Sequence, residues 1–210
     1  MMLYWDRRIE SFGPEKAFLP MTINGALRDD YEALKLGSFK ILPSRGAMGR
    51  RIAVNDTALQ FQGAQEKGIS RESMHRITWY ISHAALEDDE TTQRHGVIYL
   101  VEGKGTNVFK VDNKLSKMNQ RAAKGAIPIR MSCFHLVHPP AVLSVVWPLL
   151  KKIMSKRLLN RIRLHYGSNE RILDELAKCE IPADAIPVEN GGTLEFDFVG
   201  WLEKRKEEGK

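Results

Sequence analysis

The side chains best suited to catalysis or metal binding do not form a known catalytic or metal-binding motif. His135 and His138 are three residues apart across the end of a strand-like segment, so they point to different faces and make a poor metal pair. Gly103-Lys104-Gly105 follows an apolar run but lacks the third glycine and the helix start of a dinucleotide-binding loop. Neither a serine elbow nor a phosphate-loop lysine motif is present. The sequence therefore favours binding over covalent chemistry and implies neither a cofactor nor a metal.

The balance of charges predicts acidic partners. The 210 residues include 32 Lys or Arg and 26 Asp or Glu, which gives a net charge of +6 and a pI of about 9.3. Anionic lipid, nucleic acid or acidic protein would all be attracted. The basic residues are not interleaved with exposed aromatics, which argues against a single-strand nucleic-acid binder. Asp88, Asp89 and Glu90 are expected to be solvated charges at a helix end.

Several features favour a cytoplasmic protein. Cys133 and Cys179 form no zinc-binding pattern, and Cys133 lies in an apolar run where a buried thiol is expected. Nowhere do the ~18 successive apolar residues of a membrane span occur. Asp6, Arg7 and Arg8 stand where a signal peptide would be apolar.

Residues 141–162 are the most distinctive stretch and predict a long helix. Residues 141–150 are apolar nearly all round, whereas the second half carries five basic residues. Pro140 suits a first helical position, and Pro148 removes one internal hydrogen bond. The pattern alone favours a buried core helix with a wet, basic end. The alternative is a helix that covers an apolar cavity and touches a membrane.

The elements around this helix predict an α/β fold. A hairpin is expected at residues 38–42 and 51–55, buried strands at 97–101 and 131–137, a short strand at 163–166, and helices at about 71–87, 112–123 and 169–178. Crossovers of a dozen or more residues require parallel strands, so a mainly parallel sheet covered by helices follows. Residues 197–210 are expected to be a charged C-terminal tail, whose last eight residues, EKRKEEGK, are solvated.

These pieces, in this order, resemble the CRAL-TRIO lipid-binding domain of the phosphatidylinositol-transfer and retinaldehyde- and tocopherol-binding proteins. The matching segments are LPSRGAMGRRIAV with its Gly-Arg pair, GVIYLVEGKG with its acidic Glu102, IPIRMSCFHLVHPPAVLSVVWPLLKKIMS, RIRLHYGS, and IPADAIPVENGGTL. The resemblance implies a CRAL-TRIO-like domain over residues 36–196. Residues 1–35 look like the C-terminal remnant of the helical region that often precedes this fold.

The resemblance further implies a mobile gate helix over an apolar pocket for one hydrophobic ligand. The expected lipid-binding residues are Tyr99, Phe134, Leu136, Val142, Val145, Val146, Leu149, Leu150, Ile153 and Arg161. The expected membrane-contact residues are Trp147, Lys151, Lys152, Lys156 and Arg157. Ile129 stands where phosphatidylinositol binders carry an acid, and Arg161 where they carry a lysine, so inositol recognition is in doubt.

The predicted function is to bind one hydrophobic lipid in an internal pocket and to transfer or present it between membranes. The protein is expected to be a monomer that associates peripherally with anionic membrane surfaces. The ligand would be a phospholipid or another hydrophobic small molecule, and nucleic acid is not an expected partner. The alternative is a scaffold or regulatory module that docks on a membrane or a protein and moves no lipid. An enzyme acting on a small apolar substrate is the third interpretation, and no catalytic group supports it.

Overall fold

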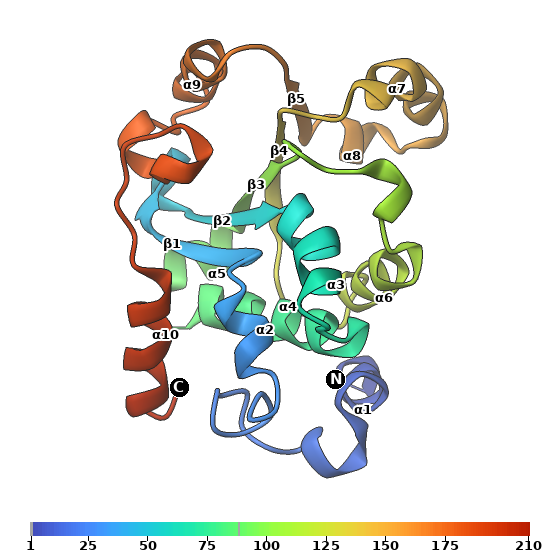
Figure 1. Cartoon of the computed structure of the whole chain (residues 1–210), viewed down its shortest axis with the longest axis vertical. Coiled ribbons are helices and arrows are strands. Elements are labelled where there is room, and N and C mark those ends of the chain that lie inside the picture. The colour runs from blue at the N-terminus through green and yellow to red at the C-terminus, as the bar shows by residue number, and fades with distance from the viewer. Residues whose placement is uncertain (1, 88) are drawn as a thin grey trace.

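A five-stranded sheet forms the middle layer of the molecule (Figure 1). The computed structural model describes residues 2–87 and 89–210, without the side chains of Met2, Leu150 and Ile153; Asp88 lies outside that range. The strands follow the chain order and are β1 (Phe39–Arg45), β2 (Arg51–Asp56), β3 (Val97–Glu102), β4 (Met131–Val137) and β5 (Ile162–His165). β1 and β2 pair antiparallel and the other neighbours pair parallel. The predicted hairpin and mainly parallel α/β sheet are therefore confirmed.

Helices lie on both faces of this sheet. They are α1 (Met2–Lys16), α2 (Tyr31–Lys35), α3 (Ala64–Glu66), α4 (Arg71–Leu86), α5 (Glu90–His95), α6 (Asn113–Ala123), α7 (Ala141–Ile153), α8 (Lys156–Leu159), α9 (Asn169–Ala177) and α10 (Phe198–Glu207). Several begin at side-chain caps, because the first N–H groups of a helix have no partner within it. Ser70 accepts from the Ser73 N–H at the start of α4, and Ser168 accepts from Arg171 at the start of α9.

Two hydrophobic clusters divide the core between the two faces. Val97 of β3 faces the first cluster, to which α1, α2, α4, α6 and α10 contribute. Ile98 and Leu100 face the second cluster, which contains Ile172 and Leu176 of α9 and Ile186. This alternation follows from the two-residue period of a strand, and it explains why VIYLV is apolar throughout.

The C-terminal segment forms the helix α10, whose first half is packed against the core, whereas the residues from Glu203 onward are mostly exposed. Phe198 and Leu202 of α10 are buried in the first cluster. Arg205 binds Glu87 of the α4 end at 2.7 Å and the Tyr80 hydroxyl at 2.7 Å. Phe198 and Leu202 are four residues apart and therefore share one face of the helix, which places both in the core.

Asp89 also departs from expectation, because it is buried and paired rather than solvated. Its carboxylate accepts from the Thr92 N–H at 2.8 Å and binds Arg45 and Arg51 at 2.8 and 2.7 Å. Burial by itself would raise the pKa of Asp89, but the Thr92 N–H and the two guanidiniums outweigh burial and lower that pKa. Asp89 therefore ties the start of α5 to the β1–β2 hairpin.

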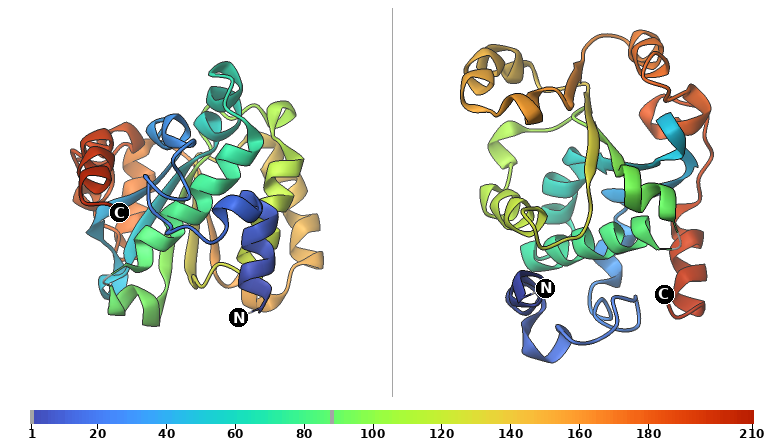
Figure 2. Two further views of the ribbon diagram at one scale, coloured as in Figure 1. Left: turned by 90° about the horizontal axis from the view of Figure 1, so that it is seen from below. Right: turned by 180° about the vertical axis from the view of Figure 1, so that it is seen from behind.

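The segment 141–162 forms two helices on one side of the molecule. α7 and α8 stand at the β4–β5 edge of the sheet, and both views of Figure 2 place them away from the central helix α4. Ser155 separates them and caps α8 by accepting from the Leu158 N–H at 3.3 Å. Within the described residues, α7 like every other helix is too short or too polar to cross a membrane.

Candidate functional site

Aromatic side chains form a row across the sheet face that contacts the first cluster. The ring of Tyr99 on β3 stacks against Phe39 at 6.2 Å and against Phe134 at 6.5 Å between centroids. The register places Tyr99 beside Phe134 and Phe134 beside Ile162 on neighbouring strands. Burial raises the pKa of the Tyr99 hydroxyl, so Tyr99 is neutral near pH 7. The row is thus an apolar surface with one neutral polar group.

This apolar surface is only partly covered near β4 and β5. Leu136 and Leu164 pair across the two strands in the same way as Phe134 and Ile162. All four side chains are half-buried, whereas Val97 of β3 and Ile41 of β1, which pack in the first cluster, are buried. The predicted lining residues Tyr99, Phe134 and Leu136 therefore lie together on a face with room for further apolar contacts.

The apolar side chains of α7 face solvent rather than the core. Val145 is 77 % exposed and Leu149 is 63 % exposed, and Val142 and Val146 are also exposed. The interpretation of this helix as a buried core element is therefore wrong. The pattern could not distinguish an apolar face that meets protein from one that meets a ligand or lipid. Leu150 and Ile153 were also predicted to line the pocket, and their side chains lie outside the described part of the structure.

Residues at the end of β3 hold the start of α7. The His138 Nδ1 lies 3.1 and 3.2 Å from the two carboxylate oxygens of Glu102, which also accepts from the Lys104 N–H at 2.7 Å. His138 has a φ of 45°, and a Cβ on Gly103 would lie 2.7 Å from the His138 carbonyl oxygen. Only glycine fits there without a shift. The turn before α7 is thus fixed, although the sequence had offered His138 only as a poor metal ligand.

Basic side chains surround the exposed apolar face. Lys151, Lys152, Lys156 and Arg157 are all exposed. The Lys151 Nζ lies 6.0 Å from the ring centroid of Trp147, which is half-buried. Helices α7 and α8 therefore present apolar and cationic groups side by side, the composition of a surface that binds anionic lipid.

Arg161 contacts a backbone carbonyl in this structure. Its Nη1 donates to the Met131 carbonyl oxygen at 2.9 Å at the start of β4. Ile129, which stands at the place of the acid in phosphatidylinositol binders, packs against the first cluster instead. Among the described residues, the Met131 carbonyl oxygen is the one hydrogen-bond partner of the Arg161 side chain, and the role of Arg161 toward a phosphate stays a prediction.

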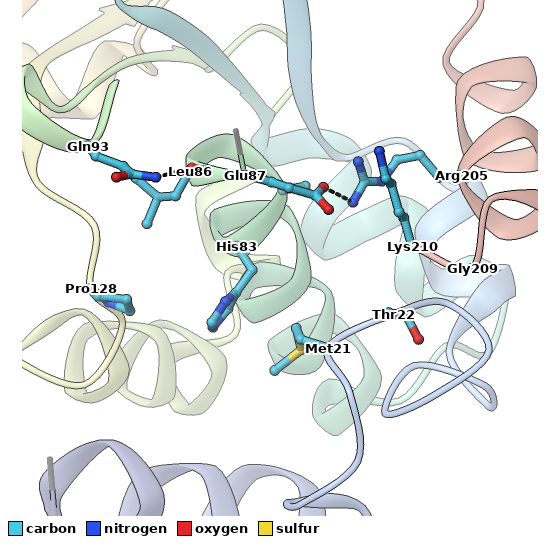
Figure 3. A pocket seen from close by; sticks show the side chains of 11 residues that line it. Met21, Thr22, His83, Leu86, Glu87, Gln93, Pro128, Arg205, Gly209 and Lys210 are labelled. Atoms are coloured by element: carbon cyan, nitrogen blue, oxygen red, sulfur yellow. Dashed lines mark hydrogen bonds and ion pairs between the residues drawn. The ribbon is translucent and has the colours of Figure 1, made fainter. Parts of the chain in front are cut away.

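A cavity of about 610 Å³ lies at a different place, and Figure 3 shows the residues that line it. His83 and Glu87 of the α4 end line it together with Met21 and Arg205. Burial and the nearby Arg8 lower the pKa of His83 to about 4, so this ring is neutral near pH 7. None of the predicted lipid-binding residues whose side chains the structure describes lines this cavity, so its size alone does not make it the lipid site.

The described residues do not form a metal centre. Across residues 2–87 and 89–210, no three His, Cys, Asp or Glu side chains are grouped so as to hold a metal ion. His135 and His138 indeed take different directions, since His135 contacts His165 and His138 contacts Glu102.

Comparison with known proteins identifies a family and several relatives. Residues 37–192 match the model of the CRAL/TRIO domain. Alpha-tocopherol transfer protein-like from Mus musculus and from Homo sapiens are each 27% identical over 126 residues, which cover 58% of this chain and 35% of the relative. Tyrosine-protein phosphatase non-receptor type 9 from Homo sapiens is 23% identical over 165 residues, covering 79% of this chain and 26% of the relative.

Among solved structures, the crystal structure of Sfh5 matches 69% of this chain and 58% of its own, with 13% identity and a TM-score of 0.49. The chain spans about a third of the length of the tocopherol transfer-like relatives it matches.

Proposed function

Because the chain belongs to the CRAL/TRIO family, whose members bind or transfer lipids, we propose that it holds one hydrophobic lipid between the face of β3–β5 and α7. The observation that carries this proposal is the exposure of the apolar side chains of α7. A helix with Val145 and Leu149 in water gains free energy when those side chains meet another apolar surface. The half-buried side chains of β4 and β5 supply such a surface on the sheet.

The proposal gives the apolar side chains of α7 two alternative partners, a bound lipid and a membrane. Burying an acyl chain contributes ~0.8 kcal/mol per CH₂ group, so a dry pocket competes well with a bilayer. With the pocket empty, the same valines and leucines can enter the edge of a membrane. The basic residues of α7 and α8 would then contact anionic headgroups, which makes membrane docking both apolar and electrostatic.

A second apolar contact with the membrane is offered by the loop after β3. Phe109 is 96 % exposed, and Lys104 and Lys110 beside it are exposed as well. Figures 1 and 2 show this segment and α7 on the same side of the molecule. A membrane that receives α7 would therefore also meet Phe109, and replacing Phe109 by serine is expected to weaken vesicle binding.

Lipid retention tests the proposal. The protein is incubated with mixed-lipid vesicles, re-isolated and extracted, and the extract is analysed by mass spectrometry. We expect about one lipid per chain in the wild type and a loss in Val145→Gln with Leu149→Gln, whose unchanged melting temperature would show an intact fold. Val188→Gln is the matched control, because Val188 is a similarly exposed valine remote from α7. Equal lipid content in all three proteins would reject the site.

An empty extract from every protein would favour the scaffold interpretation. A domain that docks on membranes but moves no lipid would still bind anionic vesicles through α7 and α8. Vesicle binding without extractable lipid is therefore the outcome that separates the two functions.

A further inference from the structure

A cationic cavity lies on the opposite face of the sheet from the proposed lipid site. Its volume is about 530 Å³, and β4, β5, α9 and the β1–β2 turn enclose it. Arg50, Arg163 and Lys178 line it together with His135, His165 and Glu175. None of these residues takes part in the proposed lipid function.

The three cations lack carboxylate partners. Among the ion pairs of the described residues, none involves Arg50, Arg163 or Lys178. The Nε of Arg50 is fully buried without a hydrogen-bond partner, and one Nη contacts only the Met48 sulfur at 3.1 Å, a weak acceptor. A buried donor without an acceptor is unfavourable, so Arg50 is suited to receive one from a ligand.

Glu175, the one carboxylate among the described residues that line the cavity, already has partners of its own. Glu175 lies 2.9 Å from the His165 Nδ1 and 3.2 Å from the Arg171 Nε. Its hydrogen bond with His165 lowers the pKa of Glu175, so the group is an ionised acceptor. Glu175 therefore does not offset the three free cations, and the cavity is suited to an anion.

Glu175, His165 and His135 form a chain of hydrogen bonds. An ionised Glu175 accepts only, so the His165 Nδ1 carries a proton. In neutral His165 the Nε2 must then accept from the Nδ1 of His135, 3.0 Å away, which leaves the His135 Nε2 as an acceptor. If His165 gains a second proton, the direction reverses and the His135 Nε2 becomes a donor.

We propose that this cavity binds a phosphate group and that binding draws one proton onto the chain of Glu175, His165 and His135. Phosphate oxygens can accept from the unpaired Arg50 Nε and from Arg163, and a guanidinium suits this geometry. An anion stabilises the doubly protonated form of His165 and favours the arrangement in which His135 donates. The phosphate can belong to a soluble ester or to a lipid headgroup.

The groups around the histidines define the expected pH dependence. Arg163 on β5, Arg50 on the β1–β2 turn and Lys178 directly after α9 oppose an added proton, whereas Glu175 favours it. Cys133 lies beside His135 and donates to the Arg161 carbonyl oxygen at 3.3 Å, and Cys179, two residues beyond the end of α9, completes the lining. Burial, with the charges of His165 and Arg163, lowers the pKa of His135 to about 4. Burial therefore disfavours an added proton on His135, and if anion binding takes up one proton on the chain, affinity for an anion rises as pH falls.

Calorimetric titration with sulfate tests the site, because sulfate keeps its charge across the neutral range. We expect saturable binding that strengthens from about pH 8 to about pH 6, with about one proton taken up in buffers of different ionisation enthalpy. Arg50→Gln and Arg163→Gln should each weaken binding about tenfold or more. Glu175→Gln should weaken the pH dependence, because it removes the carboxylate that favours the added proton. Arg28→Gln, a change at an exposed site between α1 and α2, should leave binding unaltered.

Glycerol 3-phosphate and vesicles containing phosphatidic acid identify the source of the phosphate. If Arg50→Gln and Arg163→Gln weaken the binding of glycerol 3-phosphate, the cavity is a site for a free phosphate ester. If the two variants weaken only the binding to vesicles, the cavity is a site for a lipid headgroup. If neither depends on them, or if Arg28→Gln has the same effect, the proposal is wrong; pH-independent sulfate binding would overturn the coupled proton. Lipid retention by the α7 variants is measured separately, so either proposal can fail alone.

Discussion

At the residue scale, Glu102 and His138 show how two side chains can orient a whole helix. Their contact joins the end of β3 to the turn at Pro139 and Pro140, directly before α7. The Glu102 carboxylate also holds the Lys104 N–H, so the acid has little freedom. α7 is therefore attached at a defined point while its apolar side chains remain exposed.

Recognition of the lipid headgroup is also predicted to depend on two single residues, Arg161 and Ile129. Arg161→Ala is expected to lower affinity for several phospholipids alike, because a guanidinium binds phosphate whatever alcohol is attached. Ile129 cannot accept hydrogen bonds from inositol hydroxyls, so strict selectivity for phosphatidylinositol is not expected. Competition between phospholipids on the wild type and the variant measures both. Strong selectivity for phosphatidylinositol, or unchanged affinity in the variant, would contradict the assignment.

The lowered pKa of His83 predicts how the free energy of unfolding changes with pH. Its pKa is lowered from 6.5 to about 4, chiefly by burial, so the unfolded state binds more protons between these two values. The free energy of unfolding should therefore fall as the pH falls from about 6.5 toward 4. His83→Gln should show a smaller fall in urea titrations at successive pH values. His95→Gln changes an exposed histidine and serves as the control; an equal slope in His83→Gln and the wild type would refute the prediction.

At the scale of elements, Asp89 combines a helix cap with two ion pairs. Asp197 caps α10 in the same way, accepting from the Gly200 N–H at 2.9 Å, but it is exposed. Asp197→Ala should cost about 1 kcal/mol of unfolding free energy, the usual value of a cap. Asp89→Ala should cost about 2 kcal/mol or more, because it also removes a buried partner of Arg51. Chemical denaturation compares them, and equal losses would show that the ion pairs contribute nothing.

The sequence predicts elements well where the pattern is set locally. β3 and β4 lie within one residue of their expected bounds, because long apolar runs ended by glycine or proline define them. α10 was missed because only Phe198 and Leu202 of its ten residues are buried, and its second half is charged. The burial of Asp89 was missed because Arg45 and Arg51 reach it only after the hairpin folds.

The candidate site was predictable in its members but not in its arrangement. Apolar spacing identified α7, and strand patterns identified Tyr99, Phe134 and Leu136. Sequence cannot say whether an apolar helix face meets protein, ligand or lipid, since all three remove it from water. The chain of Glu175, His165 and His135 gave no sequence signal, because its members come from α9, β5 and β4 and meet only in the folded sheet.

At the scale of the whole molecule, we expect vesicle binding to depend on where the positive charges lie and not only on the net charge. Binding to anionic vesicles should drop on Lys151→Glu with Lys152→Glu, because each basic residue near such a surface contributes ~1 kcal/mol. Lys67→Glu with Lys124→Glu changes the net charge equally at exposed sites away from α7 and should have less effect. Added salt should weaken wild-type binding. A co-sedimentation assay measures all of these, and equal binding to neutral and anionic vesicles would exclude electrostatic docking.

Hydrogen exchange of α7 with and without lipid tests the central claim most directly. An exposed helix with few packing contacts opens readily, so its amides should exchange fast in the lipid-free protein. If a lipid is held between α7 and β3–β5, the amides of residues 141–153 should exchange much more slowly in the loaded protein, while those of α10 should not change. Stoichiometric lipid binding with unchanged exchange in α7 would contradict the account and place the ligand elsewhere.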